Sequence, residues 1–500
     1  MIIVTFMTMI TTPFRNSFSI KSHFLVFLLF FSIAFVLRFF SFFPSVIDHD
    51  ESTYLVIGNE ILKGKLLYTD ATDIKPVGIF YIVAAFIRIF GRSIFGFRVF
   101  TTFIIAATSF FIYKTKLAIG HLKNVALASG IIYIFFLSVW THFGVSPNTV
   151  HFFNLFSAGA VYLFFSSKKD WKIPVMGLLF GLGFLIKIVV AFDFVALILF
   201  LFITDLLDKK FTFNRFVLYF SSGITFLIPF ALVNLVFYLT GHFDDFYQVN
   251  YVAFRNYAQQ LGFFQFLFWI LGFFVRFLPL SIFFFWSLAL KMNKENILIR
   301  ERLLVLIWIT FCLLSNYLPG KLLAHYLIQL MLPASFLAGN IMSHEIKKPV
   351  IIKNLFSKKL GYPLLILFII GNVILQKKDY FNKEDCPREI ANYLELRMNE
   401  NDIVYTGNAS QIIYFLLNTS PPTKYVHSSL LFAKEHIKAL NIDPDEVFQS
   451  ILEKKPSYIL IHDKGKNETW RLINTIREKY SQVYSFTNCR IQVYQRNTEE

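Results

Sequence analysis

Cysteine and charged residues are scarce in this sequence. Only three of the 500 residues are cysteines, and no spacing of cysteine and histidine matches a zinc site. A glycine-rich phosphate-binding loop is also missing. Charged residues make up 16% of the chain, which is far outside the range of an ordinary soluble domain. These shortages argue against a zinc-stabilised domain, a phosphate-loop nucleotide enzyme and an ordinary soluble protein.

Hydrophobic residues fill the chain instead. They account for 56% of it, with 64 phenylalanines and a mean hydropathy of +0.56. Runs of roughly 18 or more apolar residues recur, which is the length that a helix needs to cross a bilayer. Continuous Phe/Leu/Ile runs favour helices over a barrel. The first run, residues 23–43, is too long for a cleavable signal and is predicted to stay as an anchor.

The net charge of +16 is explained by orientation rather than by nucleic acid, because the basic residues lie between the apolar runs. We predict about eleven crossings of the cell (inner or plasma) membrane, with the N-terminus cytoplasmic. The predicted spans are 23–43, 97–113, 125–140, 149–165, two within 173–204, 216–240, 263–290, 303–318, 327–341 and 361–376. Residues 78–90 are too short to span and are predicted as a surface helix.

The tail changes character and is predicted to be a small extracytoplasmic α/β domain, residues 377–500, after a transmembrane domain of residues 1–376. The stretches DIVYTG, SYILIH and RIQVYQ read as strands, with helices near 409–417, 444–454 and 467–480 and one opened by Pro387. Cys386 and Cys489 flank this tail. They form a disulfide if the tail is outside, but two free thiols fit the sequence equally well.

The polar loop at 44–76 is the main candidate for chemistry. Asp48 followed by Glu51 is typical of a capping box for a helix over 49–63, which ends at Gly64. This helix is amphipathic and is expected to lie flat on the membrane. Capping gives no special reason for Asp50, whose carboxylate is suited to act as a general base on a hydroxyl. The alternative is that all three acids only cap the helix or face solvent.

Cations on the outer side form the second signal, because orientation disfavours them there. An anionic ligand would explain Lys75, Arg92 and Arg98, although single arginines at this depth also serve as interfacial anchors. Lys187 and the KLLAHY stretch mark two other outer turns. Lys321, His325 and Tyr326 in that stretch offer donors for a phosphate or a sugar. Snorkelling of Lys187 and an aromatic belt are the competing interpretations.

Several segments resemble a known family. The run D-H-D-E, the later G-K-L-L-Y-T-D-A-T-D-I-K-P and the stretch F-G-R-S-I-F-G-F-R resemble the first outer loop of membrane glycosyltransferases of the C-type fold. The similar group contains protein O-mannosyltransferases and the lipid A aminoarabinose transferase. S-P-N-T, G-L-G-F-L-I-K and K-L-L-A-H-Y-L-I-Q-L-M-L-P follow in the same order. The resemblance implies the mainly α, polytopic C-type fold, and the count of about eleven transmembrane helices comes from hydropathy and charge.

The resemblance also implies an activity: inverting transfer of a sugar from a polyprenyl-phosphate donor to a lipid, glycan or protein acceptor at the outer face. It makes Asp50 the catalytic carboxylate, with Glu51 and Asp48 beside it. Lys75 and the later outer cations and aromatics would face the donor phosphate, and Asp73 and Asn148 lie in motifs assigned to substrate. Some relatives use a divalent metal such as Mg²⁺ or Mn²⁺, which Asp48, Asp50 and Glu51 would share.

One departure from the family concerns the second outer loop. Many relatives have an acid after the Asn-Thr pair, whereas this chain has Val150 and then His151. This keeps open a catalytically silent lipid-binding scaffold. A transporter or flippase of lipid-linked sugars is the other alternative, and it predicts inverted repeats and charges near the bilayer midplane. No nucleic-acid partner is expected; the expected partners are the lipid-linked donor, membrane lipids and the acceptor.

Overall fold

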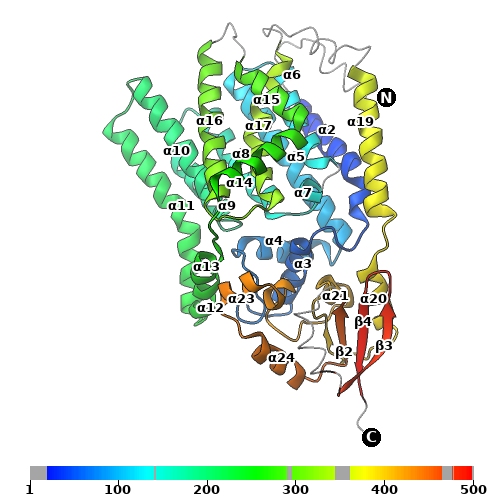
Figure 1. Cartoon of the computed structure of the whole chain (residues 1–500). Coiled ribbons are helices and arrows are strands. Elements are labelled where there is room, and N and C mark those ends of the chain that lie inside the picture. Colours follow the sequence, from blue (N-terminus) through cyan, green and yellow to red (C-terminus); the bar gives the residue numbers. More distant parts are fainter. Residues whose placement is uncertain are drawn as a thin grey trace. The chain divides into compact units, whose positions relative to one another are not determined.

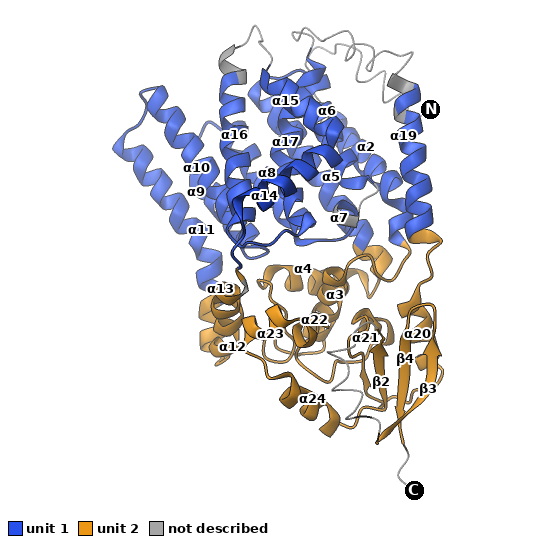
Figure 2. Cartoon of the chain, in the orientation of Figure 1, with its two compact units in different colours: residues 1–42, 98–233, 259–379 blue, residues 43–97, 234–258, 380–500 orange. Residues whose placement is uncertain are grey.

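The computed structural model of the chain describes residues 20–139, 142–289, 295–343, 361–463, 476 and 478–497. These residues form two compact units, which are coloured separately in Figure 2. Unit 1 comprises residues 1–42, 98–233 and 259–379, and unit 2 comprises residues 43–97, 234–258 and 380–500. The acidic loop therefore belongs to the same compact unit as the hydrophilic tail. The division of the chain at residue 376 stays a prediction.

Unit 1 is helical (Figure 1). Its elements are α2 (Ile20–Arg38), η1 (Phe39–Phe42), α6 (Lys123–Ser138), α7 (His142–Val145), α8 (Thr149–Ser166), α9 (Lys172–Phe184), α10 (Val190–Leu207), α14 (Phe263–Arg276), α15 (Leu278–Ala289), α16 (Glu295–Tyr317), η3 (Ala324–Leu330), α17 (Met331–Ala338), η4 (Gly339–Met342) and α19 (Gly361–Gln376). Helix α9 packs against α8 and α10, α10 packs against α16, and α17 packs against α6 and α15. The unit boundaries fall inside α5 (Ile94–Ile119), α11 (Phe213–Leu239) and η5 (Lys377–Phe381).

Most predicted spans coincide with these helices, because long apolar runs have few alternatives in a membrane. Five segments within the described residues are long and apolar enough to cross: Lys21–Phe42, Ile94–Ile119, Thr149–Ser166, Val190–Leu207 and Phe213–Leu239. The run 173–204 divides into α9 and α10, and Lys187 lies in the turn between them, as predicted. The chain is a membrane protein, and the full count of about eleven crossings stays a prediction.

The segment 263–290, which was predicted as a single crossing, is not one straight helix. Helices α14 and α15 meet at an angle of 99°. Arg276 ends α14, and Pro279 lies in the first turn of α15. Proline has no N–H for the helical ladder, and it disfavours helical backbone in the residue before it. The hydropathy of this segment therefore gives no sign of the sharp bend at this position.

Unit 2 contains the two loop helices α3 (His49–Leu62) and α4 (Gly78–Phe90), followed later by α12 (Phe243–Tyr247), η2 (Gln248–Ala253) and α13 (Phe254–Tyr257). Its tail contributes α20 (Cys386–Glu395), β1 (Val404–Tyr405), α21 (Ile412–Leu417), α22 (Ser429–Phe432), α23 (Lys434–Leu440), α24 (Pro444–Glu453), β2 (Tyr458–His462), β3 (Tyr480–Phe486) and β4 (Ile491–Arg496). The tail is α/β, as predicted.

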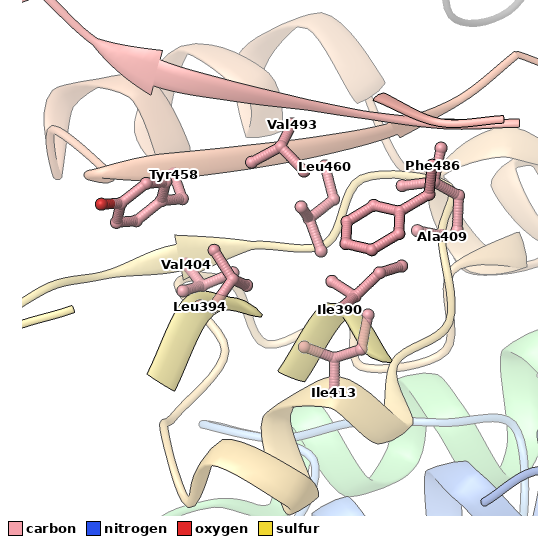
Figure 3. Packing of buried hydrophobic residues seen from close by; sticks show 10 residues of the cluster. Ile390, Leu394, Val404, Ala409, Ile413, Tyr458, Leu460, Phe486 and Val493 are labelled. Atoms are coloured by element: carbon pink, nitrogen blue, oxygen red, sulfur yellow. The ribbon is translucent and has the colours of Figure 1, made fainter. Parts of the chain in front are cut away.

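The tail sheet has the strand order β1-β2-β4-β3, in which β1 and β2 are parallel and the other pairs are antiparallel. Ile390 and Leu394 of α20 and Ile413 of α21 pack with Leu460 and Val493 of the sheet (Figure 3). Strand β3 was not predicted, because only its two ends are buried and its middle residues are exposed. The predicted helix at 467–480 lies largely outside the described residues.

Cys386 and Cys489 form a disulfide, which decides between the two alternatives that the sequence left open. The bond joins the start of α20 to the turn between β3 and β4. Disulfides persist in oxidising compartments. The pairing thus agrees with a tail that lies outside the cytoplasm.

Candidate active site

Helix α3 positions the acidic residues of the loop. Asp48 is its N-cap, and the side chain accepts a hydrogen bond of 3.1 Å from the backbone N–H of Asp50. Gly64, two residues beyond the end of α3, has a φ of 86°, a backbone conformation that glycine adopts without strain. Capping by Asp48 and termination near Gly64 are therefore confirmed.

The prediction that α3 lies flat on the membrane is wrong. Every residue from Glu51 to Glu60 is buried within the protein. Helix α3 packs against α4 and α21, and a Cβ atom at Gly58 would lie 2.7 Å from Val83 Cγ1. The polar residues that suggested a solvent-facing side are covered by other segments: Asn59 donates a 3.1 Å hydrogen bond to Asn418. Long-range packing overrides the amphipathic pattern here.

The structure brings together Asp50, Asp73 and Lys75. The Nζ atom of Lys75 lies 3.1 Å from Oδ1 of Asp50 and 3.3 Å from Oδ2 of Asp73. Asp73 is buried, whereas the side chains of Asp50 and Lys75 keep 16% and 21% of their surface exposed. The Tyr68 hydroxyl donates to the carbonyl of Lys75 at 2.8 Å and helps to hold the loop. A reactant can thus reach the Asp50–Lys75 pair while its environment stays partly desolvated.

His427 is part of this site, although the sequence did not suggest it. Its Nε2 atom lies 3.9 Å from Oδ1 of Asp50. An isolated bridge between Thr72 and Tyr425 places the tail segment beside the loop. In that bridge, the Thr72 N–H donates to the carbonyl of Lys424 at 2.7 Å. The only sequence signal was a histidine in a stretch without clear periodicity, and its partner lies in a distant part of the chain.

Burial changes the protonation of this site. It raises the pKa of the Asp48 carboxyl above its usual range, and the nearby charge of Asp50 raises it further. Burial lowers the pKa of His427 to about 4, although Asp73 and Asp50 act in the opposite direction. The pKa of His436 is lowered for the same main reason. Near neutral pH, Asp50 therefore faces an ammonium on one side and a neutral imidazole on another.

The other candidates in unit 2 lie away from solvent or hold helices together. Glu51 is buried in the first turn of α3. The Arg92 guanidinium donates to the carbonyl of Phe415 and lies 5.2 Å from the centroid of its ring. Arg92 therefore ties the segment after α4 to α21. Binding of the donor phosphate by Arg92 remains a prediction.

Unit 1 brings together a second set of candidates. The Nζ atom of Lys187 lies 3.9 Å from the centroid of the Tyr326 ring, which His325 contacts edge-on at 4.7 Å. Lys321 is buried in the segment before η3. Arg98 is fully buried and donates to the carbonyl of Ser41 at 2.9 Å. The Lys187–Tyr326 contact brings together two segments that the sequence placed at separate outer turns.

Asn148 is the N-cap residue of α8, and its side-chain oxygen accepts a hydrogen bond of 3.1 Å from Thr149. Val150 is buried in the first turn of α8. His151 is also buried and donates from Nε2 to the carbonyl of Ser146 at 3.1 Å. The position where many relatives have an acid is therefore an apolar packing position in this chain.

A metal at the acids finds little support in this geometry. Within the residues that the structure describes, no group of three or more His, Cys, Asp and Glu side chains is arranged to hold a metal ion. The countercharge next to Asp50 is Lys75. A requirement for Mg²⁺ or Mn²⁺ shared by Asp48, Asp50 and Glu51 stays a prediction.

Two solved structures share this fold. Crystal structures of ArnT from Cupriavidus metallidurans, one bound to undecaprenyl phosphate and one in the apo state, superpose with TM-scores of 0.65 and 0.63. Each is 13% identical in sequence, and the match covers 95% of this chain and 98% of the other. The fold is therefore that of the C-type membrane glycosyltransferases, as the sequence predicted.

A family comparison agrees with the fold. Residues 74–235 match the family described as dolichyl-phosphate-mannose-protein mannosyltransferase. The match contains Lys75, Arg92, Arg98, Asn148 and Lys187 but begins after Asp50. No curated protein sequence matches the chain significantly. These matches agree with the recognition made from the sequence: the fold is that of the C-type membrane glycosyltransferases, and residues 74–235 are similar to the mannosyltransferase family.

Proposed function

We propose that this protein transfers a sugar from a polyprenyl-phosphate donor to a hydroxyl of a lipid, glycan or protein acceptor, with inversion, at the outer face of the membrane. The observation that carries the proposal is the contact of Lys75 with Asp50 at the start of α3. It places an ammonium beside an accessible carboxylate, and an adjacent positive charge favours the ionised form that a general base requires. The shared fold with a protein solved with undecaprenyl phosphate supports the donor class.

The chemistry is a single displacement. Asp50 takes the proton of the acceptor hydroxyl while that oxygen bonds to the anomeric carbon of the sugar. The bond from this carbon to the phosphate oxygen breaks, and the polyprenyl phosphate leaves with the electron pair. Because the attack comes from the face opposite the leaving group, the configuration of the anomeric carbon inverts. Cations near the leaving phosphate lower the barrier by stabilising its developing charge.

Lys75 serves Asp50 in this proposal more than it serves the donor. Its ammonium already contacts the carboxylates of Asp50 and Asp73, so the three groups together carry net negative charge. A phosphate at Lys75 would therefore meet the net negative charge of this group. The outer turns of unit 1, with Lys187 beside Tyr326, are the better candidate for the phosphate.

The orientation follows from charge and redox chemistry. Basic residues between the spans favour a cytoplasmic N-terminus. The disulfide of Cys386 with Cys489 favours an oxidising compartment for the tail. Asp50 belongs to the same compact unit as that disulfide. Transfer is therefore proposed for the extracytoplasmic side of the cell membrane.

The test is sugar transfer by the purified full-length protein. Radiolabelled polyprenyl-phosphate sugars would be supplied as a panel with a mixture of lipid, glycan and peptide acceptors. The parent should transfer one sugar, and D50N should be slower by about 10²- to 10⁴-fold, the usual contribution of a general base. D445N, which changes an exposed acid of the tail, should match the parent. Equal rates for D50N and the parent would refute the role of Asp50.

Inactivity of the parent towards every donor would refute transfer itself. The same panel, reconstituted in vesicles and assayed for movement of the labelled lipid, would then measure the alternative activity of a flippase.

A further inference from the structure

The tail segment that carries His427 is held against the acidic loop by the main chain. The Thr72–Tyr425 bridge has the Thr72 N–H donating to the carbonyl of Lys424 at 2.7 Å, and the Val426 N–H donating to the carbonyl of Thr72 at 3.4 Å. His427 follows directly after this paired segment. On the loop side, Asp73 follows directly after Thr72, and Lys75 comes two residues later. The bridge therefore sets the register between His427 and the carboxylate that Lys75 contacts.

The orientation of the His427 ring is fixed as well. The backbone N–H of Ser429 donates to Nδ1 of His427 at 3.1 Å, and the Ser429 hydroxyl lies 2.8 Å from the same atom. That hydroxyl is also 2.9 Å from Nδ1 of His436. A backbone N–H can only donate, so Nδ1 of His427 must accept. The neutral ring consequently carries its proton on Nε2.

Nε2 is the atom that faces Asp50, at 3.9 Å from Oδ1. The same oxygen is contacted by Nζ of Lys75 at 3.1 Å. The distance of 3.9 Å exceeds a hydrogen bond, so the Nε2–H group acts on the carboxylate as an electrostatic contact at this separation. With its proton on Nε2, His427 offers Asp50 a donor and has no lone pair there to receive a proton. The ring is therefore placed to orient the carboxylate and not to relay its proton.

We infer that His427 of the tail is a positioning residue for the transfer reaction: its Nε2–H and Lys75 together orient the Asp50 carboxylate, and Ser429 orients the His427 ring. The inference rests on the proposed function. It gives the tail a part in the chemical step, beyond covering the loop. No lipid or sugar contact is required of His427, so donor and acceptor affinity should not depend on it.

The experiment uses amides that imitate the two ring nitrogens separately. In H427Q the side-chain NH₂ reaches the place of Nε2, whereas in H427N it reaches only the place of Nδ1. The full-length parent, H427Q, H427N, H427A and S429A would be compared for kcat and for the KM of donor and acceptor. K434A, an exposed change on α23, is the matched control.

The expected result is a fall in kcat on the order of 100-fold for H427A and H427N, the scale of misplacing a reacting group by about an ångström. KM values should stay within about twofold, since binding contacts are unchanged. H427Q should retain most of the parent rate, and S429A should lie between the parent and H427A. K434A should equal the parent. If His427 had only a structural role, H427Q would not be active while H427N was nearly inactive.

Failure of the inference about His427 can be distinguished from failure of the proposed function. If the parent transfers sugar and H427N is as fast as H427Q, the inference about His427 is overturned while the proposed function stands. If the parent transfers no sugar from any donor, the proposed function fails and the assignment of His427 falls with it. If H427A does not accumulate in the membrane, the comparison of H427Q with H427N still tests the positioning role of His427.

Discussion

The ammonium of Lys75 lies 3.1 Å from the carboxylate of Asp50, although the two residues are 25 positions apart in the sequence. The pair is only partly exposed, so each partner sets the state of the other more than it would in open water. Asp73, which is buried, contacts the same ammonium at 3.3 Å. This relationship yields the first prediction.

Removing the charge of Lys75 should slow transfer through Asp50. K75M is expected to lower kcat at least about tenfold, because a partly desolvated carboxylate loses its countercharge. The double variant D50N/K75M should be no slower than D50N within about threefold, since residues that act as a unit are not additive. K65M, an exposed lysine of the same loop, is the control. If the losses in kcat of D50N and K75M add up in the double variant, Lys75 acts independently of Asp50.

Asp48 can be tested for capping and for chemistry in one pair of variants. D48A should lower the free energy of unfolding by about 0.5–2 kcal/mol, whereas D48N keeps an N-cap acceptor and should lose much less. Thermal unfolding in detergent measures this difference. Sugar transfer is then measured on the same samples. Loss of activity in both variants, with loss of stability in D48A alone, would assign the carboxylate a role beyond the cap.

Acid should destabilise the protein partly through His427. In the folded protein its pKa is lowered from 6.5 to about 4, chiefly by burial. Below pH 6.5 the unfolded chain binds a proton that the folded chain does not, so stability falls as the pH drops from 6.5 towards 4. The loss is at most about 3 kcal/mol, at 1.36 kcal/mol per pKa unit.

When the pH is lowered from 7 to 4.5, the midpoint temperature of thermal unfolding should therefore fall less steeply for H427Q than for the parent. His436, whose pKa burial also lowers, leaves part of the dependence in place. Identical slopes for the two proteins would contradict the buried neutral state of His427.

Breaking the disulfide should loosen the tail. It closes a loop with a sequence separation of 103 residues. C386S/C489S should unfold with a free energy lower by about 2–4 kcal/mol, the typical value for a native bond. Dithiothreitol should lower the thermal midpoint of the parent and leave that of the double variant unchanged, which separates the bond from the substitutions. A parent that is insensitive to the reductant in the unfolding experiment would argue against the bond.

The contact of Lys187 with Tyr326 should affect binding of the donor. Y326F keeps the aromatic face and should bind the donor like the parent, whereas Y326L removes the face. Y326L and K187M are expected to raise the donor KM by the equivalent of about 0.5–2 kcal/mol, the range of a cation–π contact. The acceptor KM serves as the internal control. A rise in the acceptor KM alone would place these residues at the other substrate.

The spans and several tail elements were predictable because their signals are local. Apolar runs predicted α8 and α11 to within a few residues, and Pro387 marked the start of α20. The same signals failed at 263–290, where Pro279 introduces a bend that hydropathy does not record. They failed at β3 as well, since an edge strand with an exposed middle lacks the alternation of a half-buried one.

The site was predicted in part. Asp50 and Lys75 were named from the sequence, and the structure places them in contact. Their roles, like those of Arg92 and Arg98, still await experiment. His427 was missed, because a histidine without periodic neighbours carries no local sign of a partner.

The sequence by itself determined the class of protein, the positions of most helices and the capping acid at the start of α3. Those properties depend on hydropathy, on helix-terminal hydrogen bonds and on residues within one or two turns of each other. Only the tertiary structure decided that α3 is buried, that Cys386 pairs with Cys489 and that His427 faces Asp50. These contacts join segments that are far apart in the sequence, and the Thr72–Tyr425 bridge sets the register of His427 against the loop.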